Sequence, residues 1–131
     1  YNRRKQNSLY IKERGLSMSY KWPDKDKDEL LDYSIDWSRF LSSSTLAGND
    51  TIGSVDWYIY DADGTKTEVS DSQVVDGLQF VTGTIDEETD TIATIRLSLG
   101  TNNKRYKIAC RITTGSNLKY ERSVFIRIKE K

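Results

Sequence analysis

The sequence offers few side chains that could act as catalysts or metal ligands. It has no histidine, so the commonest general base and the commonest metal ligand of proteins are both missing. Its single cysteine, Cys110, lies in an alternating apolar run, which indicates a small buried side chain. No phosphate-binding loop of the form GxxxxGK[ST] occurs. We therefore expect no enzymatic activity, no metal site and no cofactor.

Two acidic stretches have oxygen atoms at a spacing that a hard cation could use. The segment Asp61-Ala62-Asp63-Gly64 resembles the opening of a calcium loop, but the twelfth position, which should be glutamate, is Ser72. The cluster at 86–90, DEETD, shows no ligand pattern. We interpret the first stretch as a hairpin turn and the second as a solvated loop.

Basic residues gather near the C-terminus, where they alternate with apolar residues. If the last two predicted strands pair, one outward face carries five of them: Arg105, Lys107, Arg111, Arg127 and Lys129. Phe125 on the same face could stack a base, and the cations could bind phosphates. The chain has equal numbers of basic and acidic residues, 20 of each, so it lacks a net field that would attract nucleic acid. We expect this face to be either solvated or matched to an acidic protein partner, with Arg105, Lys107 and Arg127 as the candidate contact residues, and we expect no nucleic acid.

Alternation of apolar and polar residues dominates the chain from residue 33 onward, which is the pattern of half-buried strands. The predicted inward sets are Tyr33, Ile35 and Trp37 in YSIDWSRFL; Val55, Trp57 and Ile59; Leu78 and Phe80; Ala93, Ile95, Leu97 and Leu99; Tyr106, Ile108, Cys110 and Ile112; and Val124, Ile126 and Ile128. Ile52 has the opposite parity to Val55, so we predict a β-bulge at Gly53-Ser54.

Turn sequences separate these runs and complete the fold prediction. DADG (61–64), GTNN (100–103) and TGSN (114–117) all contain residues that tolerate positive φ, as tight hairpins require. With TKTEV (65–69) as a short extra strand, the count is about seven. The sequence thus predicts an all-β chain, with an immunoglobulin-like antiparallel β-sandwich over residues 33–131. Tyr106 is a candidate for the tyrosine-corner role.

The first 32 residues differ from this pattern. Residues 1–17 are basic and lack a clean period, and we hypothesise that they are a non-native or disordered leader, with the native start at Met18. The alternative is a genuine basic arm that docks on a partner. Residues 18–32 form an N-terminal arm that we interpret as extended, with at most one helical turn after Pro23. No apolar run reaches the roughly 20 residues of a membrane helix and no signal-peptide pattern appears, so we expect no membrane contact.

Several of these segments together resemble the small fibre-tail adaptor proteins of tailed bacteriophages. The resemblance is carried by KWPDKDKDELLDYSIDWSRFL (21–41), DTI (50–52) with Ser54 and Trp57, GL (77–78) and YKIACRITTGSNLKYERSVFIRI (106–128). It covers essentially residues 18–129. The turns at 100–103 and 115–119 depart from the glycine-rich turns of that family, so contacts made by those loops are expected to differ.

The resemblance implies a virion structural protein that folds in the host cytoplasm and links the tail or neck to fibres. It implies several copies around the tail axis, contacts with other phage structural proteins, and no catalysis. We expect Tyr20, Trp22 and Pro23 of the arm to dock on a partner, so that removal of residues 18–29 leaves a folded domain that no longer joins the virion. The alternative is that Trp22 covers the end of the sandwich. The alternative function is an immunoglobulin-like binding module, a carbohydrate-recognising or capsid-decorating domain in which Tyr58, Tyr60 or Tyr120 stacks a ligand.

Overall fold

The structure is a computed structural model of the chain, and it describes residues 7–10, 20–43, 50–61, 63–86 and 90–130. These residues form the strands β1 (Asn7–Tyr10), β2 (Tyr20–Lys21), β3 (Leu31–Asp36), β4 (Ile52–Tyr60), β5 (Lys66–Glu68), β6 (Gln73–Val75), β7 (Leu78–Ile85), β8 (Ile92–Leu99), β9 (Arg105–Thr114) and β10 (Lys119–Arg127), and the helix α1 (Ser38–Ser43). No described helix is long and apolar enough to cross a membrane.

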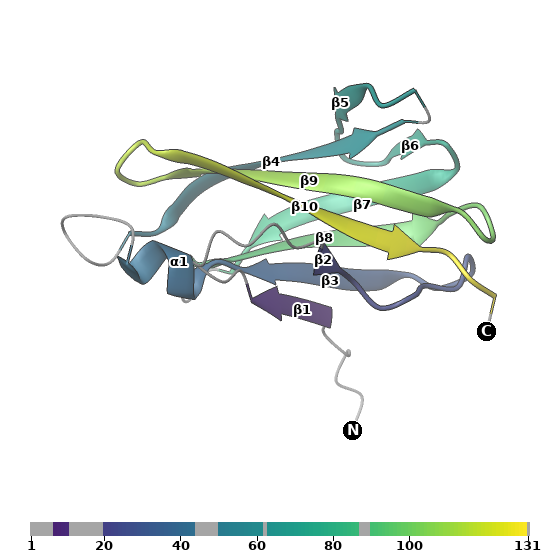
Figure 1. Cartoon of the computed structure of the whole chain (residues 1–131), viewed down its shortest axis with the longest axis horizontal. Helices are drawn as coiled ribbons and strands as arrows, with labels where there is room; N and C mark the ends of the chain where they lie inside the picture. Colours follow the sequence, from purple (N-terminus) through teal and green to yellow (C-terminus); the bar gives the residue numbers. More distant parts are fainter. Residues whose placement is uncertain (1–6, 11–19, 44–49, 62, 87–89, 131) are drawn as a thin grey trace.

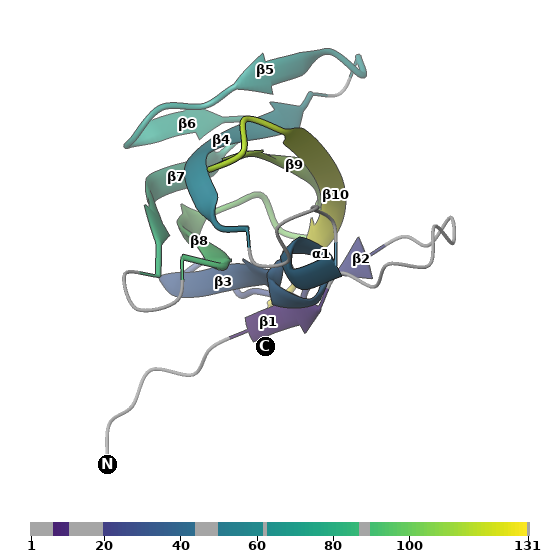
Figure 2. The same cartoon turned by 90° about the vertical axis from the view of Figure 1, so that its left-hand side faces the viewer.

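The strands form two sheets that pack face to face (Figures 1 and 2). One sheet has the order β1-β3-β8-β7-β6 and the other β2-β10-β9-β4-β5. Within each sheet four strands are antiparallel, and the N-terminal strand joins one edge in parallel, β1 beside β3 and β2 beside β10. The prediction of an all-β antiparallel sandwich is confirmed. The immunoglobulin-like assignment within this class stays a prediction.

The core lies between the sheets and consists mainly of the side chains that alternation places inward. Tyr33, Ile35, Trp57, Ile59, Leu78, Phe80, Ala93, Ile95, Leu97, Tyr106, Ile108, Cys110, Ile112, Val124, Ile126 and Ile128 are all buried. The register of β4 against β9 shifts between Ile52 and Ser54, which confirms the predicted bulge and brings Ile52 to the buried side. One inward prediction is wrong: Leu99 is 47% exposed, because it has a φ of 63° at the end of β8 and turns out of the sheet plane.

The Tyr106 side chain ties two turns together across the end of the sandwich. It is buried, and its hydroxyl donates to the Asp76 carbonyl at 2.7 Å while accepting from the Thr101 backbone N–H at 3.0 Å. The hydroxyl therefore bonds backbone groups, as in a tyrosine corner. Its carbonyl acceptor lies 30 residues upstream, in the β6–β7 turn, whereas the tyrosine-corner acceptor lies only a few residues upstream.

The strand predicted over YSIDWSRFL ends earlier than expected. β3 stops at Asp36, and the next residues form α1. The Asp36 carboxylate accepts a hydrogen bond from the Ser38 N–H at 2.9 Å, which is N-terminal capping chemistry. Trp37 remains buried because Leu41 and Phe40 fold around it from the helix. Alternation alone could not show this, since a capped helix of six residues buries the same apolar side chains as a strand.

The strand count is also higher than the predicted seven. β6 pairs with Leu78–Phe80 of β7, although its three residues, QVV, gave too short a run to be recognised. Residues 7–10, inside the segment expected to be a leader, form β1 along β3. The rest of that segment, including Met18, lies outside the described residues.

The arm of residues 20–25 is part of the sandwich. β2 pairs with Val124 and Phe125 of β10, and Lys25 continues this line as a parallel bridge to Ile128. The backbone is extended, as predicted, with one turn at Lys27 and Asp28. The arm thus supplies an edge strand, in which polar residues lie on both sides of one buried aromatic side chain.

Trp22 is that anchor, and its position corrects the expected docking role. The side chain is fully buried, its indole Nε1 donates to the Ser34 carbonyl at 3.2 Å, and its ring lies 5.0 Å from the Tyr33 ring. A side chain with no exposed surface cannot contact a partner in this fold. Removal of residues 18–29 would take this indole out of the core, so we now expect the truncated domain to be less stable than the full chain.

Candidate protein–protein interface

The outer face of the β2-β10-β9-β4-β5 sheet carries the basic residues singled out in the sequence. Cross-strand register places Arg105 opposite Arg127, and Lys107 between Tyr60 on β4 and Phe125 on β10. Further along the same face, Arg111 lies between Asp56 and Glu121. Alternation predicts this face correctly because β9 and β10 are long, regular strands with buried inward residues.

At one end of this face, cations lie over aromatic rings. The Arg105 guanidinium lies 4.0 Å from the centroid of the Phe125 ring, and the Lys107 ammonium lies 4.3 Å from that of Tyr60. Each such contact contributes about 0.5–1 kcal/mol at an exposed site and holds the long side chain in one orientation. Neither cation, nor Arg127 beside them, has an ion-pair partner among the described residues. We call Arg105, Lys107, Phe125 and Arg127 the basic end.

The arm adds one cation that sequence reasoning missed. Lys21 of β2 lies opposite Phe125 in a parallel pair, and its side chain is 62% exposed, with only a 3.7 Å contact to Asp24. Trp22 points inward, so its neighbour Lys21 points to the outer face. Two paired residues give no alternation that could be read from the sequence, which is why this addition was not predicted.

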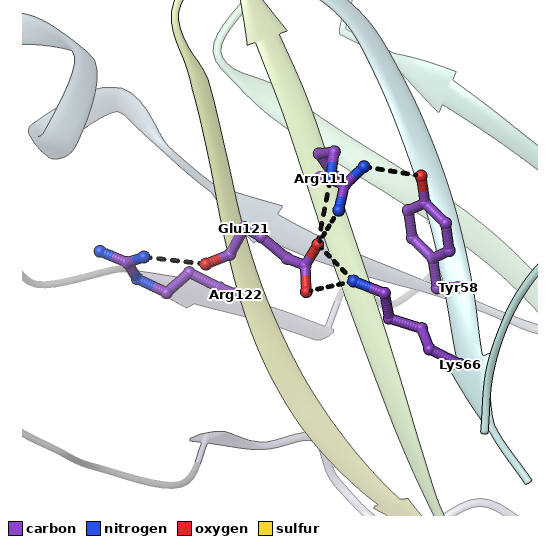
Figure 3. Close-up of polar contacts among 5 residues, drawn as sticks. All are labelled: Tyr58, Lys66, Arg111, Glu121 and Arg122. Carbon is purple, nitrogen blue, oxygen red and sulfur yellow. Dashed lines mark hydrogen bonds and ion pairs between the residues drawn. The ribbon is translucent and has the colours of Figure 1, made fainter. Parts of the chain in front are cut away.

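In the middle of the face, two cations share one carboxylate of the same sheet (Figure 3). The Glu121 carboxylate lies 3.0 Å from the Lys66 ammonium and 3.0 Å from the Arg111 guanidinium. Arg111 also donates to the Tyr58 hydroxyl at 3.2 Å, so four strands are joined by one network. Arg111 belongs to the predicted face, but its guanidinium is already paired with the Glu121 carboxylate.

The tyrosines proposed for ligand stacking are covered or packed. Cations lie over the rings of Tyr58, with Lys66 at 4.8 Å from the centroid, and of Tyr60, with Lys107 at 4.3 Å. Tyr120 is half-buried, with its ring 4.3 Å from that of Phe40 in an edge-on contact. Each of these three rings is thus already engaged in a contact within the chain.

The outer face of the opposite sheet has a different character. Arg96 makes an ion pair with Asp32 at 2.8 Å, and this bond raises the pKa of the guanidinium. The Ser34 and Thr94 hydroxyls share a hydrogen bond of 2.7 Å. Polar groups on this face satisfy one another, so it offers a partner less unpaired charge than the basic end does.

The arm residues predicted to dock are therefore separated by the fold. Trp22 is buried, whereas Pro23 is exposed beside it. Tyr20 lies in β2, paired with Val124, which places its backbone next to the basic end. A docking role for Tyr20 and Pro23 stays a prediction.

The single cysteine is buried, as the alternating pattern predicted. Cys110 is fully buried, and desolvation raises the pKa of its thiol far above the ordinary range, so the thiol stays protonated. Among the described residues, no group of three His, Cys, Asp or Glu side chains is arranged to hold a metal ion.

Comparison with known proteins agrees with the resemblance found in the sequence. No curated protein matches the chain. A family model described as podophage GP4 fiber-tail adaptor protein gp77 matches residues 25–127, which is most of the chain and spans β3 to β10. The chain belongs to this podophage fiber-tail adaptor family.

Proposed function

We propose that the protein links phage fibres to the tail or neck through protein–protein contacts, and that the basic end binds an acidic surface of one of these partners. The observation that supports the proposal is the presence of three cations, Arg105, Lys107 and Arg127, without ion-pair partners among the described residues. Membership of the adaptor family makes a phage structural protein the natural partner.

The chemistry of the basic end suits a contact between proteins. Phe125 and Tyr60 hold Arg105 and Lys107 in place, so less side-chain entropy is lost when an acidic partner arrives. Charges at the rim of an interface mainly raise the association rate and exclude wrong partners. Repeated copies around the tail axis would each present this face, and a stable contact would bury roughly 1,200–2,000 Å².

Charge reversal in an infecting phage tests the proposal. The variant Arg105→Glu with Arg127→Glu should fold, because both side chains are exposed, but should give particles that lack fibres or the adaptor itself. The matched control is Arg39→Glu with Lys119→Glu, which changes the net charge equally at exposed sites in α1 and at the start of β10, the opposite end of that strand from Arg127. Quantitative gels of purified particles would count both proteins.

Two outcomes would refute the docking role of this face. The first is normal incorporation of adaptor and fibre with the Arg105 and Arg127 variant. The second is an equal loss with the control variant, since that would make the effect one of net charge alone.

A further inference from the structure

The flank formed by β5 and β6 is only partly closed. β5 pairs with Tyr58–Tyr60 alone, so the first half of β4 has no neighbouring strand on that side among the described residues. β6 pairs with Leu78–Phe80 alone, and the second half of β7 is similarly uncovered. Both short strands lie together at one side of the molecule, away from β1, β2 and β3 (Figure 1).

A groove opens between these two uncovered half-strands. It is a cavity of about 280 Å³, lined from β4, from the last residue of β5 and the segment after it, and from β7 and β8. Its apolar walls are Val55, Trp57, Val69, Phe80, Ile85 and Ile95. A space of this size, open to solvent, can accept one or two side chains of an inserted segment.

The charge around the groove has a single sign. Asp56, Glu68 and Asp71 line it, and no basic residue does. None of the three carboxylates has an ion-pair partner among the described residues. An occupant with lysine or arginine side chains would complement this rim.

Hydrogen-bonding groups inside the groove are also unused. Trp57 is only 5% exposed, yet its Nε1 donor has no acceptor among the described residues. It faces the space left by Gly83, whose absent Cβ would lie 3.0 Å from this nitrogen. The Trp57 carbonyl accepts from the Val69 N–H, so the backbone of Val55, two residues earlier, points to the same open side.

We propose that this groove binds an extended segment of a partner protein that alternates lysine or arginine with apolar residues and adds a strand beside the first half of β4. The segment places apolar side chains against Trp57 and Phe80, and its cations meet Glu68 and Asp71. Strand addition of this kind combines backbone pairing with side-chain pockets. The inference does not depend on the basic end, which lies on the outer face of the sheet.

A designed peptide tests the groove directly. The probe is an acetylated, amidated heptapeptide that alternates lysine and valine, titrated into the ¹⁵N-labelled full-length chain. The indole signal of Trp57, identified as the one missing in Trp57→Phe, and the Val55 amide signal should both shift. A peptide with glutamate in place of lysine, and a lysine peptide N-methylated at alternate amides, should each bind at least roughly tenfold more weakly.

Charge variants locate the site on the chain. Glu68→Lys with Asp71→Lys should weaken peptide binding at least roughly tenfold, whereas the exposed pair Asp28→Lys with Asp63→Lys should leave it unchanged. Arg105→Glu with Arg127→Glu should bind the peptide like the unaltered chain, even if the proposed role of the basic end is wrong. Thermal unfolding of each variant verifies that it folds.

Three results would overturn the proposal. One is equal binding of the lysine and glutamate peptides. Another is peptide binding that the Glu68 and Asp71 changes do not weaken, with the shifted amide signals on another face of the molecule. The third is self-association of the chain, measured by sedimentation, that the Glu68 and Asp71 changes abolish, because a second copy would then occupy the groove.

Discussion

The two flanks of the sandwich are built in opposite ways. At one flank the arm lies against β10 and inserts Trp22 between the sheets, so the core is sealed by a buried indole. At the other flank β5 and β6 cover only half of β4 and β7, and a cavity of about 280 Å³ remains. The flank that looked like a docking arm is structural, and the flank that looked like plain hairpin turns is the one with room for a partner.

The difference shows how an adaptor can hold its fold while it keeps a surface available. Apolar burial concentrates at the closed flank, where even Lys25 is fully buried and its ammonium donates to the Leu99 carbonyl at 2.7 Å and the Asp26 carbonyl at 2.8 Å. Two buried polar atoms there, the Tyr33 hydroxyl and Asp24 Oδ1, have no hydrogen-bond partner among the described residues. The half-open flank keeps unpaired carboxylates and an unused indole donor. Stability and binding are thereby assigned to different edges of the same sheets.

The largest expected effect is loss of the Trp22 anchor. Trp22→Ala should lower the free energy of unfolding by about 3–5 kcal/mol, because a fully buried aromatic side chain leaves a cavity behind. Val69→Ala at the half-open flank should cost only about 1 kcal/mol, since Val69 is half-buried beside an existing space. Urea denaturation measures both, and equal losses would remove the contrast between the flanks.

Two glycines offer the next comparison. Gly100 has a φ of +118°, and a Cβ there would come within 2.7 Å of the Ile128 side chain near the closed flank. Gly64, in the β4–β5 turn, has a φ of +85° and open space around it. Gly100→Ala should therefore cost about 2–4 kcal/mol, the sum of backbone strain and overpacking, and Gly64→Ala about 1–2 kcal/mol from backbone strain alone. Unfolding midpoints that rank the other way would contradict this packing.

Removal of the buried ammonium should have a smaller effect. Lys25→Met keeps the apolar length of the side chain but leaves the Leu99 and Asp26 carbonyls without their donor, which should cost about 1–3 kcal/mol. The matched control is Lys27→Met. Lys27 follows Lys25 closely in the sequence but is exposed, so the free energy of unfolding should hardly change. A neutral Lys25→Met would mean that the arm is not packed as described.

The smallest effect concerns the start of β4, the strand whose first half is uncovered. Burial of Asp50 acts to raise its pKa, but hydrogen bonds from the Thr114 hydroxyl and from the N–H groups of Thr51 and Ser116 outweigh burial and hold the pKa below its ordinary value. The contribution of this carboxylate to stability is therefore complete above the unfolded-state pKa and is lost as the pH falls toward the folded-state value.

Asp50→Asn tests this pH dependence. Its melting temperature should lie below that of the unaltered chain at neutral pH, and the two curves should converge below the ordinary value of 3.8. A gap that stays constant from pH 7 to pH 2.5 would show that the charge of Asp50 is irrelevant.

The sequence predicted the long strands well and the arm poorly, for one physical reason. In β9 and β10, alternation reports burial directly, so Arg105, Lys107 and Arg127 were placed correctly on one face. In the arm, Trp22 and Lys25 are buried by a parallel edge strand of two residues, and no period can form over so short a pairing. The charged residues around Trp22 suggested that the whole segment is exposed to solvent, whereas Trp22 itself is buried between them.

The half-open flank could not be predicted because its features arise from strand ends that meet in space. Asp56, Glu68 and Asp71 come from three different parts of the chain, and each alone is an ordinary surface acid. Trp57 was correctly predicted as inward. Its Nε1 has no hydrogen-bond partner among the described residues and lies against Gly83 of β7. Nothing in the spacing of these two residues along the sequence indicates that contact.

Amide hydrogen exchange of the full-length chain most directly tests the claim that the arm is structural and the opposite flank is open. The Trp22 and Lys25 amides donate to the Phe125 and Arg127 carbonyls at 2.9 Å, so they should exchange as slowly as core amides of β9. The Val55 amide, which faces the uncovered side of β4, should exchange much faster. Fast exchange at Trp22 and Lys25 with the sandwich otherwise protected would contradict the claim and return the arm to a docking role.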